Sequence, residues 1–375
     1  MSLDRYTLLG RSGLRVSPMS LGTMTFGTEW GWGADEATAQ RLFDLYVDAG
    51  GNFIDTADLY TEGTSEQWVG RFTAARAMRE RLVIATKYSY NAQPGNPNAG
   101  GNHRKNLLRA LEGSLRRLGT DYIDLYYLHT WDRMTPADEV MRAMDDAVSA
   151  GKIRYVGLSD VPAWYAGRAQ TLADWRGFEP VAAMQLEYSM IERNAEHEFA
   201  DLATHLGMGL VAWSPLGMGV LSGKYRPSQD AQNQAAVTGS GRLQTLGAAP
   251  PPGFDKLSAR NFSIVAELEA VAHAANRPMA QVALNWLYQK RGVASIVVGA
   301  TKAAQLEQSL GALDFVLAPE LIARLDAASE PPHPFPYYMF ADGHQARIHG
   351  QVDVAAQPPN HADFQRVPAP QPTGK

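Results

Sequence analysis

The regular alternation of short apolar runs with helical segments is the feature that most constrains the fold of this chain. Eight apolar runs occur, at residues 18–24, 52–57, 81–89, 122–130, 153–159, 180–189, 209–216 and 294–300. Between them lie segments such as ATAQRLFDLYVDAG and KNLLRALEGSLRRLG, which carry apolar residues at helical spacing and a C-cap glycine. Continuous apolar strands are typical of parallel sheets that are covered on both faces. The pattern predicts an α/β fold, a single (β/α)8 TIM barrel over residues 1–330, with a doubly wound sheet as the alternative.

Three segments fall outside the eight strand–helix units. Residues 5–17 predict an N-terminal β-hairpin around Gly10–Gly13, which could plug the bottom of the barrel. Residues 217–260 are rich in glycine, glutamine and proline without a clear period, so we expect a long loop insertion, either a lid or disordered. Residues 331–375 are proline-rich, and we expect them to form a C-terminal tail.

The composition argues against several classes of function. The formal net charge of −5 comes without long runs of one sign, so neither nucleic acid nor a membrane surface is an expected partner. The absence of cysteine removes disulfides, thiolate metal sites and cysteine nucleophiles, and it fits a reducing compartment. We find neither a signal-peptide pattern nor an apolar stretch of membrane length. We therefore expect a cytoplasmic protein that acts on a small molecule, and a homo-oligomer is possible.

Polar residues stand where three consecutive apolar runs end. Asp55 follows Phe53 and Ile54, and Tyr60 comes five residues after Asp55. Lys87 and His129 stand near the ends of the next two runs. Because the carboxyl ends of barrel strands meet at one rim, we expect Asp55, Tyr60, Lys87 and His129 to lie together.

These residue types suit proton donation to a carbonyl group. An unperturbed tyrosine has a pKa of about 10, and the ammonium of Lys87 would lower the pKa of Tyr60 by favouring the phenolate. Asp55 can hold Lys87 in position, while His129 can hydrogen-bond a carbonyl oxygen and orient the substrate. Tyr60 would then be the general acid for a carbonyl that receives a hydride. This chemistry needs no metal and no covalent intermediate.

At these residues the sequence resembles the aldo-keto reductase family. The family's Asp-x4-Tyr motif is present as Asp55-Thr-Ala-Asp-Leu-Tyr60, its lysine as Ala-Thr-Lys87 and its histidine as Asp-Leu-Tyr-Tyr-Leu-His129. The likeness extends from about Arg5 to Asp326. Within the family, WSPLGMGVLSGKY and VVGATKAAQLEQSLGAL are similar to the cofactor segments of a bacterial branch that includes potassium-channel β subunits and aryl-alcohol dehydrogenases. The resemblance implies an NADP-dependent reductase of aldehydes or ketones, or an alcohol dehydrogenase.

The cofactor would lie across the rim, because no G-x-G-x-x-G motif opens a helix. Glycines in 217–223 allow close approach of a pyrophosphate, and the helix after the last strand favours an anion at its start. The resemblance implies contacts that run from the nicotinamide ribose and carboxamide, past an aromatic platform and the pyrophosphate, to the adenosine. They are Gly22, Thr23, Met24, Asp55, Ser159, Asp160, Gln185, Trp213, Ser214, Pro215, Leu216, Gly219, Leu221, Lys224, Gly299, Thr301, Lys302, Gln305, Gln308 and Ser309.

Particular positions refine this cofactor assignment. Lys302 near a 2′-phosphate favours NADP(H) over NAD(H), which stays possible. Asp160 stands where the family usually has Asn, and an ionised carboxylate cannot donate to the carboxamide oxygen, although it can accept from the carboxamide nitrogen. Ser309 stands where this branch often has Asn, and its shorter side chain would reach the adenine less well.

Aromatic residues cluster in the predicted rim loops. They predict an apolar cleft for a ring-bearing carbonyl or a sugar face, although such residues also pack loops together. They are Phe26, Trp30, Trp32, Tyr88, Tyr90 and Trp131.

Two other functions remain open at this point. One is an NADP-binding regulatory or sensor protein, related to channel β subunits, with little turnover. The other is a metal-dependent barrel hydrolase using Asp55 and His129, although no second histidine stands at ligand spacing near either residue.

Overall fold

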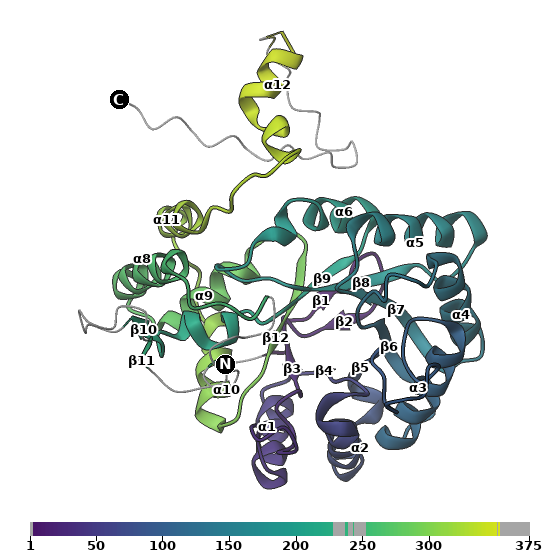
Figure 1. The fold of residues 1–375 in the computed structure, drawn as a ribbon. Helices are drawn as coiled ribbons and strands as arrows, with labels where there is room; N and C mark the ends of the chain where they lie inside the picture. The colour runs from purple at the N-terminus through teal and green to yellow at the C-terminus, as the bar shows by residue number, and fades with distance from the viewer. Residues whose placement is uncertain (1–2, 228–236, 239–242, 244–252, 351, 353–375) are drawn as a thin grey trace, which may run out of the picture. The chain divides into compact units, whose positions relative to one another are not determined.

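The computed structural model describes residues 3–227, 237–238, 243, 253–350 and 352. The chain separates into two compact units, Met1–Ser329 and Glu330–Lys375. The first unit contains the barrel, whose strands lie at the centre of Figure 1.

Eight parallel strands close into a barrel, which confirms the predicted fold and excludes the doubly wound alternative. The last strand completes the ring, because Ile296 pairs with Met19 on one side and with Ala212 on the other. The strands are β3 (Met19–Gly22), β4 (Phe53–Asp55), β5 (Val83–Tyr88), β6 (Ile123–Leu128), β7 (Ile153–Ser159), β8 (Val181–Glu187), β9 (Gly209–Trp213) and β12 (Val293–Val298).

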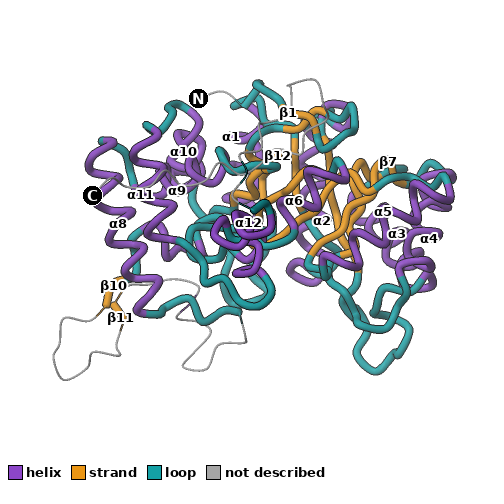
Figure 2. Tube along the Cα trace, turned by 90° about the horizontal axis from the view of Figure 1, so that it is seen from above, coloured by secondary structure: helices purple, strands orange, loops and turns teal. Residues whose placement is uncertain are grey.

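Helices surround the strands, as Figure 2 shows. Local signals set their ends: Asp35 caps the first helix by accepting from the backbone of Thr38, and Gly119 ends the third in a left-handed conformation. The helices of the first unit are α1 (Glu36–Asp48), α2 (Thr64–Ala75), α3 (Arg104–Leu118), α4 (Ala137–Ser149), α5 (Ala163–Arg176), α6 (Phe199–Leu206), α8 (Ala259–Ala275), α9 (Met279–Tyr288), α10 (Ala303–Leu310) and α11 (Pro319–Ser329).

The core has two layers, because side chains alternate along each strand. In β5, Val83 and Ala85 belong to a cluster inside the barrel. Ile84 and Tyr88 belong to the larger cluster between strands and helices. This alternation decides which strand-end residues reach the inside of the barrel mouth.

The N-terminal hairpin closes the bottom of the barrel, in agreement with the prediction. It consists of β1 (Thr7–Leu8) and β2 (Arg15–Val16), and Val16 is fully buried in the inner cluster. Its turn runs through Gly10, where φ is +59° and a Cβ atom would lie 2.4 Å from the carbonyl oxygen of Gly207. Only glycine fits this approach.

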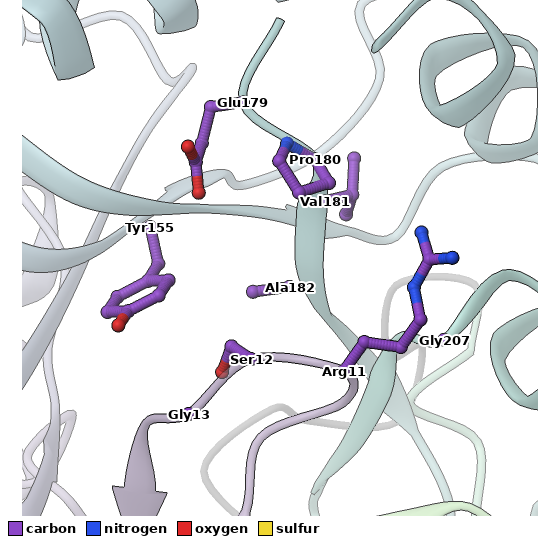
Figure 3. Close-up of a pocket in the computed structure, with 9 residues that line it drawn as sticks. All are labelled: Arg11, Ser12, Gly13, Tyr155, Glu179, Pro180, Val181, Ala182 and Gly207. Atoms are coloured by element: carbon purple, nitrogen blue, oxygen red, sulfur yellow. The ribbon is translucent and has the colours of Figure 1, made fainter. Parts of the chain in front are cut away.

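A small cavity of about 170 Å³ lies beside this turn. Arg11 and Ser12 of the hairpin line it together with Tyr155 and Glu179, which lie near the N-terminal ends of β7 and β8 (Figure 3). It is therefore at the end of the barrel opposite to the strand ends that carry Asp55 and Lys87.

The segments outside the strand–helix units carry some local structure where they are described. In 217–260 these elements are the 3₁₀ helix η4 (Gly217–Ser222), the antiparallel pair β10 (Arg226–Pro227) and β11 (Val237–Thr238), and the start of α8 at Ala259. Other positions of the expected insertion lie outside the described residues. In the second unit, η6 (Tyr337–Phe340) and α12 (Asp342–Ile348) occupy part of the expected tail. None of the helices in the described ranges has both the length and the apolar character needed to cross a membrane.

Candidate active site

The barrel mouth brings together the polar residues expected at the strand ends. Asp55 ends β4, Lys87 is the penultimate residue of β5, and His129 directly follows β6. Lys87 Nζ donates to Asp55 Oδ1 at 2.6 Å, to the carbonyl oxygen of Thr56 at 2.8 Å and to Tyr60 Oη at 3.2 Å. The lysine thus joins the carboxylate to the phenol.

The charges of this cluster act on one another inside the protein. Burial is the largest single influence on Lys87 and favours the neutral amine, but the charges and hydrogen bonds of Asp55 and Tyr60 together outweigh it, so the pKa of Lys87 is raised. For Tyr60 the balance is the reverse of the sequence expectation. Burial raises the pKa of Tyr60 more than Lys87 lowers it, so the pKa lies above its usual value. Tyr60 therefore keeps its proton at neutral pH.

His129 is a neutral group beside the phenol. Burial, followed by the charge of Lys87, holds the pKa of His129 well below its usual value. Its ring meets that of Tyr60 edge-on, with 5.9 Å between the centroids, and its Nδ1 is buried without a hydrogen-bond partner. A neutral imidazole with an unused ring nitrogen can hydrogen-bond a ligand without adding charge.

The loop that carries Tyr60 has a strained backbone, and hydrogen bonds to neighbouring segments support it. Thr61 and Glu62 have φ values of 46° and 57°, a left-handed backbone that costs residues other than glycine about 1–2 kcal/mol each. Thr61 Oγ1 donates to the carbonyl oxygen of Phe26 at 2.6 Å. At the start of α2, the fully buried Glu66 accepts from Arg117 Nε at 2.6 Å. These contacts fix the position of the phenol.

The ends of β7, β8 and β9 form a second corner of the mouth, where the nicotinamide was expected. Ser159 pairs in register with Gln185, and Gln185 Nε2 donates to Asp55 Oδ2 at 2.6 Å. Trp213 Nε1 donates to Asp160 Oδ1 at 3.1 Å. Ser159 Oγ is buried without a hydrogen-bond partner. An unsatisfied buried hydroxyl beside an indole fits a planar ligand that carries an amide.

The expected phosphate end lies at η4 and the following turn. Met218 and Gly219 have positive φ, and the side chain of Lys224 crosses Gly219, because a Cβ there would lie 2.4 Å from Lys224 Cε. Lys302 is the N-cap residue of α10 and is exposed. Two cations and a helix start are thus available for an anionic ligand.

Some expected cofactor residues have their side chains engaged elsewhere. Thr23 is fully buried, and its hydroxyl donates to the carbonyl oxygen of Asp55 at 3.0 Å. Leu221 is fully buried in the hydrophobic core. Ser309 Oγ donates to the carbonyl oxygen of Gln305 at 2.9 Å within α10. Any contribution of these three residues to a ligand is therefore indirect or through the backbone.

Two groups of aromatic rings flank Tyr60 and His129. On one side Trp30 meets Tyr60 edge-on at 6.5 Å between centroids, and Trp32 lies 5.7 Å from Trp30. On the other side Tyr90, which is 47% exposed, meets His129 edge-on at 5.1 Å. The phenol and the imidazole therefore stand between aromatic walls.

The other expected pocket aromatics are placed differently. Phe26 is fully buried against Phe72, and Tyr88 is fully buried and stacked on Tyr126 at 5.3 Å. Trp131 meets Trp164 edge-on at 5.4 Å at the start of α5. Phe26 and Tyr88 are therefore core residues and do not line an open pocket.

Sequence reasoning missed several supporting contacts, including that of Gln185, which was expected at the cofactor and not at Asp55. Glu66 and Arg117 are 51 positions apart, and Gln185 lies 130 positions from Asp55. The sequence did offer one signal for Glu66, because this charged residue lies on the face of α2 that is buried. In the described part of the chain, no group of three or more His, Asp or Glu side chains is placed to hold a metal ion.

The chain belongs to the aldo/keto reductase family, whose profile matches residues 18–330, and it is accordingly an oxidoreductase with a TIM barrel. The recognised family resemblance is thereby confirmed. Among its relatives is an NADP(+) aryl-alcohol dehydrogenase from Phanerodontia chrysosporium, 33% identical over 90% of this chain and 88% of the relative. A norsolorinic acid reductase from Aspergillus flavus is 33% identical over 86% of this chain and 80% of the relative. An uncharacterized oxidoreductase from Bacillus subtilis is 36% identical over 86% of this chain and 94% of the relative.

Proposed function

We propose that this protein is an NADP(H)-dependent enzyme that reduces an aldehyde or ketone to an alcohol, or catalyses the reverse oxidation. One observation carries the proposal. The buried Lys87 joins the carboxylate of Asp55 to the phenol of Tyr60 at the mouth of the barrel. An acid, a cation that stabilises its conjugate base and an anchor for that cation are the parts that the proton transfer of a carbonyl reduction requires.

Tyr60 is the general acid in this proposal. Its raised pKa keeps it protonated at neutral pH, and the ammonium of Lys87 stabilises the phenolate once the proton has passed to the carbonyl oxygen. Asp55 holds Lys87 in position. Neutral His129 hydrogen-bonds the same carbonyl oxygen and orients it toward Tyr60. In the oxidative direction Tyr60 accepts the proton of the alcohol.

The residues at the second corner of the mouth would hold NADP(H), which supplies the hydride when bound. The free hydroxyl of Ser159 suits the carboxamide, and the indole of Trp213 suits the face of the nicotinamide ring. Lys302 at the start of α10 suits a 2′-phosphate, which favours NADP(H) over NAD(H). The name of the Phanerodontia relative, which specifies NADP(+), supports the same choice.

The substrate in this proposal is a small carbonyl compound or alcohol, with its reacting carbon between the two aromatic walls. Trp30, Trp32 and Tyr90 suit a flat, apolar substrate. The names of two relatives, an aryl-alcohol dehydrogenase and a norsolorinic acid reductase, point in the same direction.

NADPH consumption with a panel of aryl aldehydes, ketones and keto sugars tests the function. The proposal predicts turnover of at least one aryl aldehyde by the wild-type protein. If NADPH binds tightly, no carbonyl is turned over and the Tyr60→Phe change alters nothing, the enzymatic proposal fails and the protein is better described as an NADP-binding regulator.

A further inference from the structure

Asp160 places a carboxylate at the corner of the barrel mouth where the nicotinamide is expected. It directly follows β7, and its backbone N–H donates to the carbonyl oxygen of Gln185 at 3.2 Å. Its φ of +45° is a left-handed conformation, which aspartate tolerates better than most residues. This backbone aims the side chain at Trp213, whose Nε1 donates to it at 3.1 Å. Asp160 thus lies at the corner where Ser159, Gln185 and Trp213 meet.

The charged and titratable groups around Asp160 leave its negative charge uncompensated. Lys87 is the cation that acts on it from β5, but Lys87 is already paired with Asp55. Glu187 at the end of β8 adds a second negative charge, which is itself paired with Lys256 at 2.9 Å. The charge of Asp160 also raises the pKa values of the Tyr60 and Tyr90 phenols. Within the described residues, no salt bridge joins Asp160 to a cation.

We infer that Asp160 makes this site prefer the oxidised cofactor. The inference rests on the proposed function, in which the nicotinamide lies against Trp213 with its carboxamide near Ser159 and Gln185. The nicotinamide ring carries a positive charge in NADP⁺ and none in NADPH. A carboxylate beside the ring therefore attracts the oxidised form more than the reduced form.

The hydrogen bonds at this corner fit the same role. An ionised carboxylate is only an acceptor, so Asp160 can receive a bond from the carboxamide nitrogen but cannot donate to its oxygen. The amide nitrogen of Gln185 is engaged with Asp55. Ser159 Oγ has no hydrogen-bond partner within normal geometry, although its hydroxyl lies near enough to Asp160 to lower the pKa of that carboxyl group, and it can donate to the carboxamide oxygen. Asp160 is thus not needed as a donor, and its contribution to the cofactor is its charge.

The preference depends on pH because Asp160 titrates near neutrality. Asp160 is exposed at the open barrel mouth, and desolvation by the surrounding protein raises the pKa of its carboxyl group to about 7. Above that pH the group is ionised and the preference for NADP⁺ is present. As the pH falls below it, protonation removes the charge and the preference fades.

The test is the ratio of the dissociation constants of NADP⁺ and NADPH, measured by isothermal titration calorimetry at pH 8.5. Asp160→Asn removes the charge but keeps an oxygen for Trp213 Nε1 and suits the left-handed backbone. We expect this variant to raise the ratio of NADP⁺ to NADPH dissociation constants about tenfold, as charge removal at close range does. In the wild-type protein, lowering the pH to 5.5 should shift the ratio in the same direction.

Glu179→Gln is the matched control. Glu179 is one of the residues that line the cavity near the N-terminal end of β8 (Figure 3), so it lies at the opposite end of the barrel from Asp160. This change removes the same charge as Asp160→Asn and should leave the ratio of dissociation constants unchanged. Binding of both cofactor forms with the same ratio in Asp160→Asn and wild type would overturn this inference alone. Failure of the wild-type protein to bind either form would instead overturn the proposed function, and the inference with it.

Discussion

Lys87 Nζ lies 2.6 Å from Asp55 Oδ1, and the two side chains are only 0% and 2% exposed. Removing one member of a buried ion pair leaves an uncompensated charge and typically costs ~3–5 kcal/mol of stability. The pair that the proposed chemistry requires is therefore also a structural element of the barrel mouth.

Asp55→Asn should accordingly lower the free energy of unfolding by ~3–5 kcal/mol, because Lys87 loses its counter-charge. Adding Lys87→Met to the same chain should restore part of that loss, since the double variant buries no unpaired charge. Guanidinium chloride unfolding of the two single variants and the double variant measures the coupling. Strictly additive losses would contradict the account of this pair.

Arg117 supports the strained loop of Tyr60 through Glu66. Arg117→Met should destabilise the protein by ~3 kcal/mol or more, because Glu66 is fully buried and would lose its cation. It should also lower kcat, because the loop that positions the phenol loses its support. A second change, Glu66→Gln, should recover stability in the Arg117→Met background. The idea fails if kcat is unaffected although stability falls.

The pH dependence of stability should reveal the neutral state of His129. Its pKa in the folded protein lies well below its ordinary value, whereas in the unfolded chain it is about 6.5. Between these two values the unfolded state binds more protons, so the free energy of unfolding falls as the pH falls through about 6.5. Relative to His129→Gln, the wild-type protein should lose ~1–2 kcal/mol between pH 8 and pH 5. Urea unfolding across this range measures the difference, and a constant offset between the two proteins would speak against the assignment.

Tyr90 should contribute to the binding of flat aromatic substrates and not to that of short aliphatic ones. It forms the exposed aromatic wall next to His129, and an aromatic pair is worth about 0.5–1.5 kcal/mol beyond area burial. Tyr90→Ala should raise KM for an aryl aldehyde about fivefold and leave KM for a short aliphatic aldehyde nearly unchanged. Steady-state kinetics with both substrates on both proteins provides the comparison. Equal effects on the two substrates would mean that Tyr90 acts on the fold of the mouth and not on the substrate.

Much of the fold was predictable because its signals are local. Each buried parallel strand is a continuous apolar run, and each run ends where a loop must begin, so Asp55, Lys87 and His129 could be placed at one rim. The hairpin at residues 5–17 was visible from its turn glycines for a similar reason.

Tyr88 was predicted to line the substrate pocket but is buried in the core, and this difference has a physical explanation. Side chains alternate along a strand, so Lys87 facing the barrel mouth obliges its neighbour Tyr88 to face the helices. The period-two pattern of β5 contained this information. Phe26, by contrast, lies in an irregular loop, and its burial against Phe72 depends on a contact 46 positions away (72 − 26).

Two kinds of information could not be predicted from the sequence: contacts between distant segments, and the direction of a pKa shift that has opposing causes. The hydrogen bond from Gln185 to Asp55 joins strands 130 positions apart. The direction of the pKa shift of Tyr60 depends on whether burial, which raises the pKa, is stronger than the charge of Lys87, which lowers it. The extent of burial of the phenol, which only the folded structure shows, determines the result.

The most direct test of the central claim is the rate of NADPH oxidation by Tyr60→Phe with an aryl aldehyde, alongside its dissociation constant for NADPH. Phenylalanine keeps the ring that meets Trp30 and His129 and removes only the proton donor. The account predicts that kcat falls by about a hundredfold to ten-thousandfold, the usual contribution of a general acid, while the dissociation constant stays within about twofold. Turnover at the wild-type rate in Tyr60→Phe would contradict it.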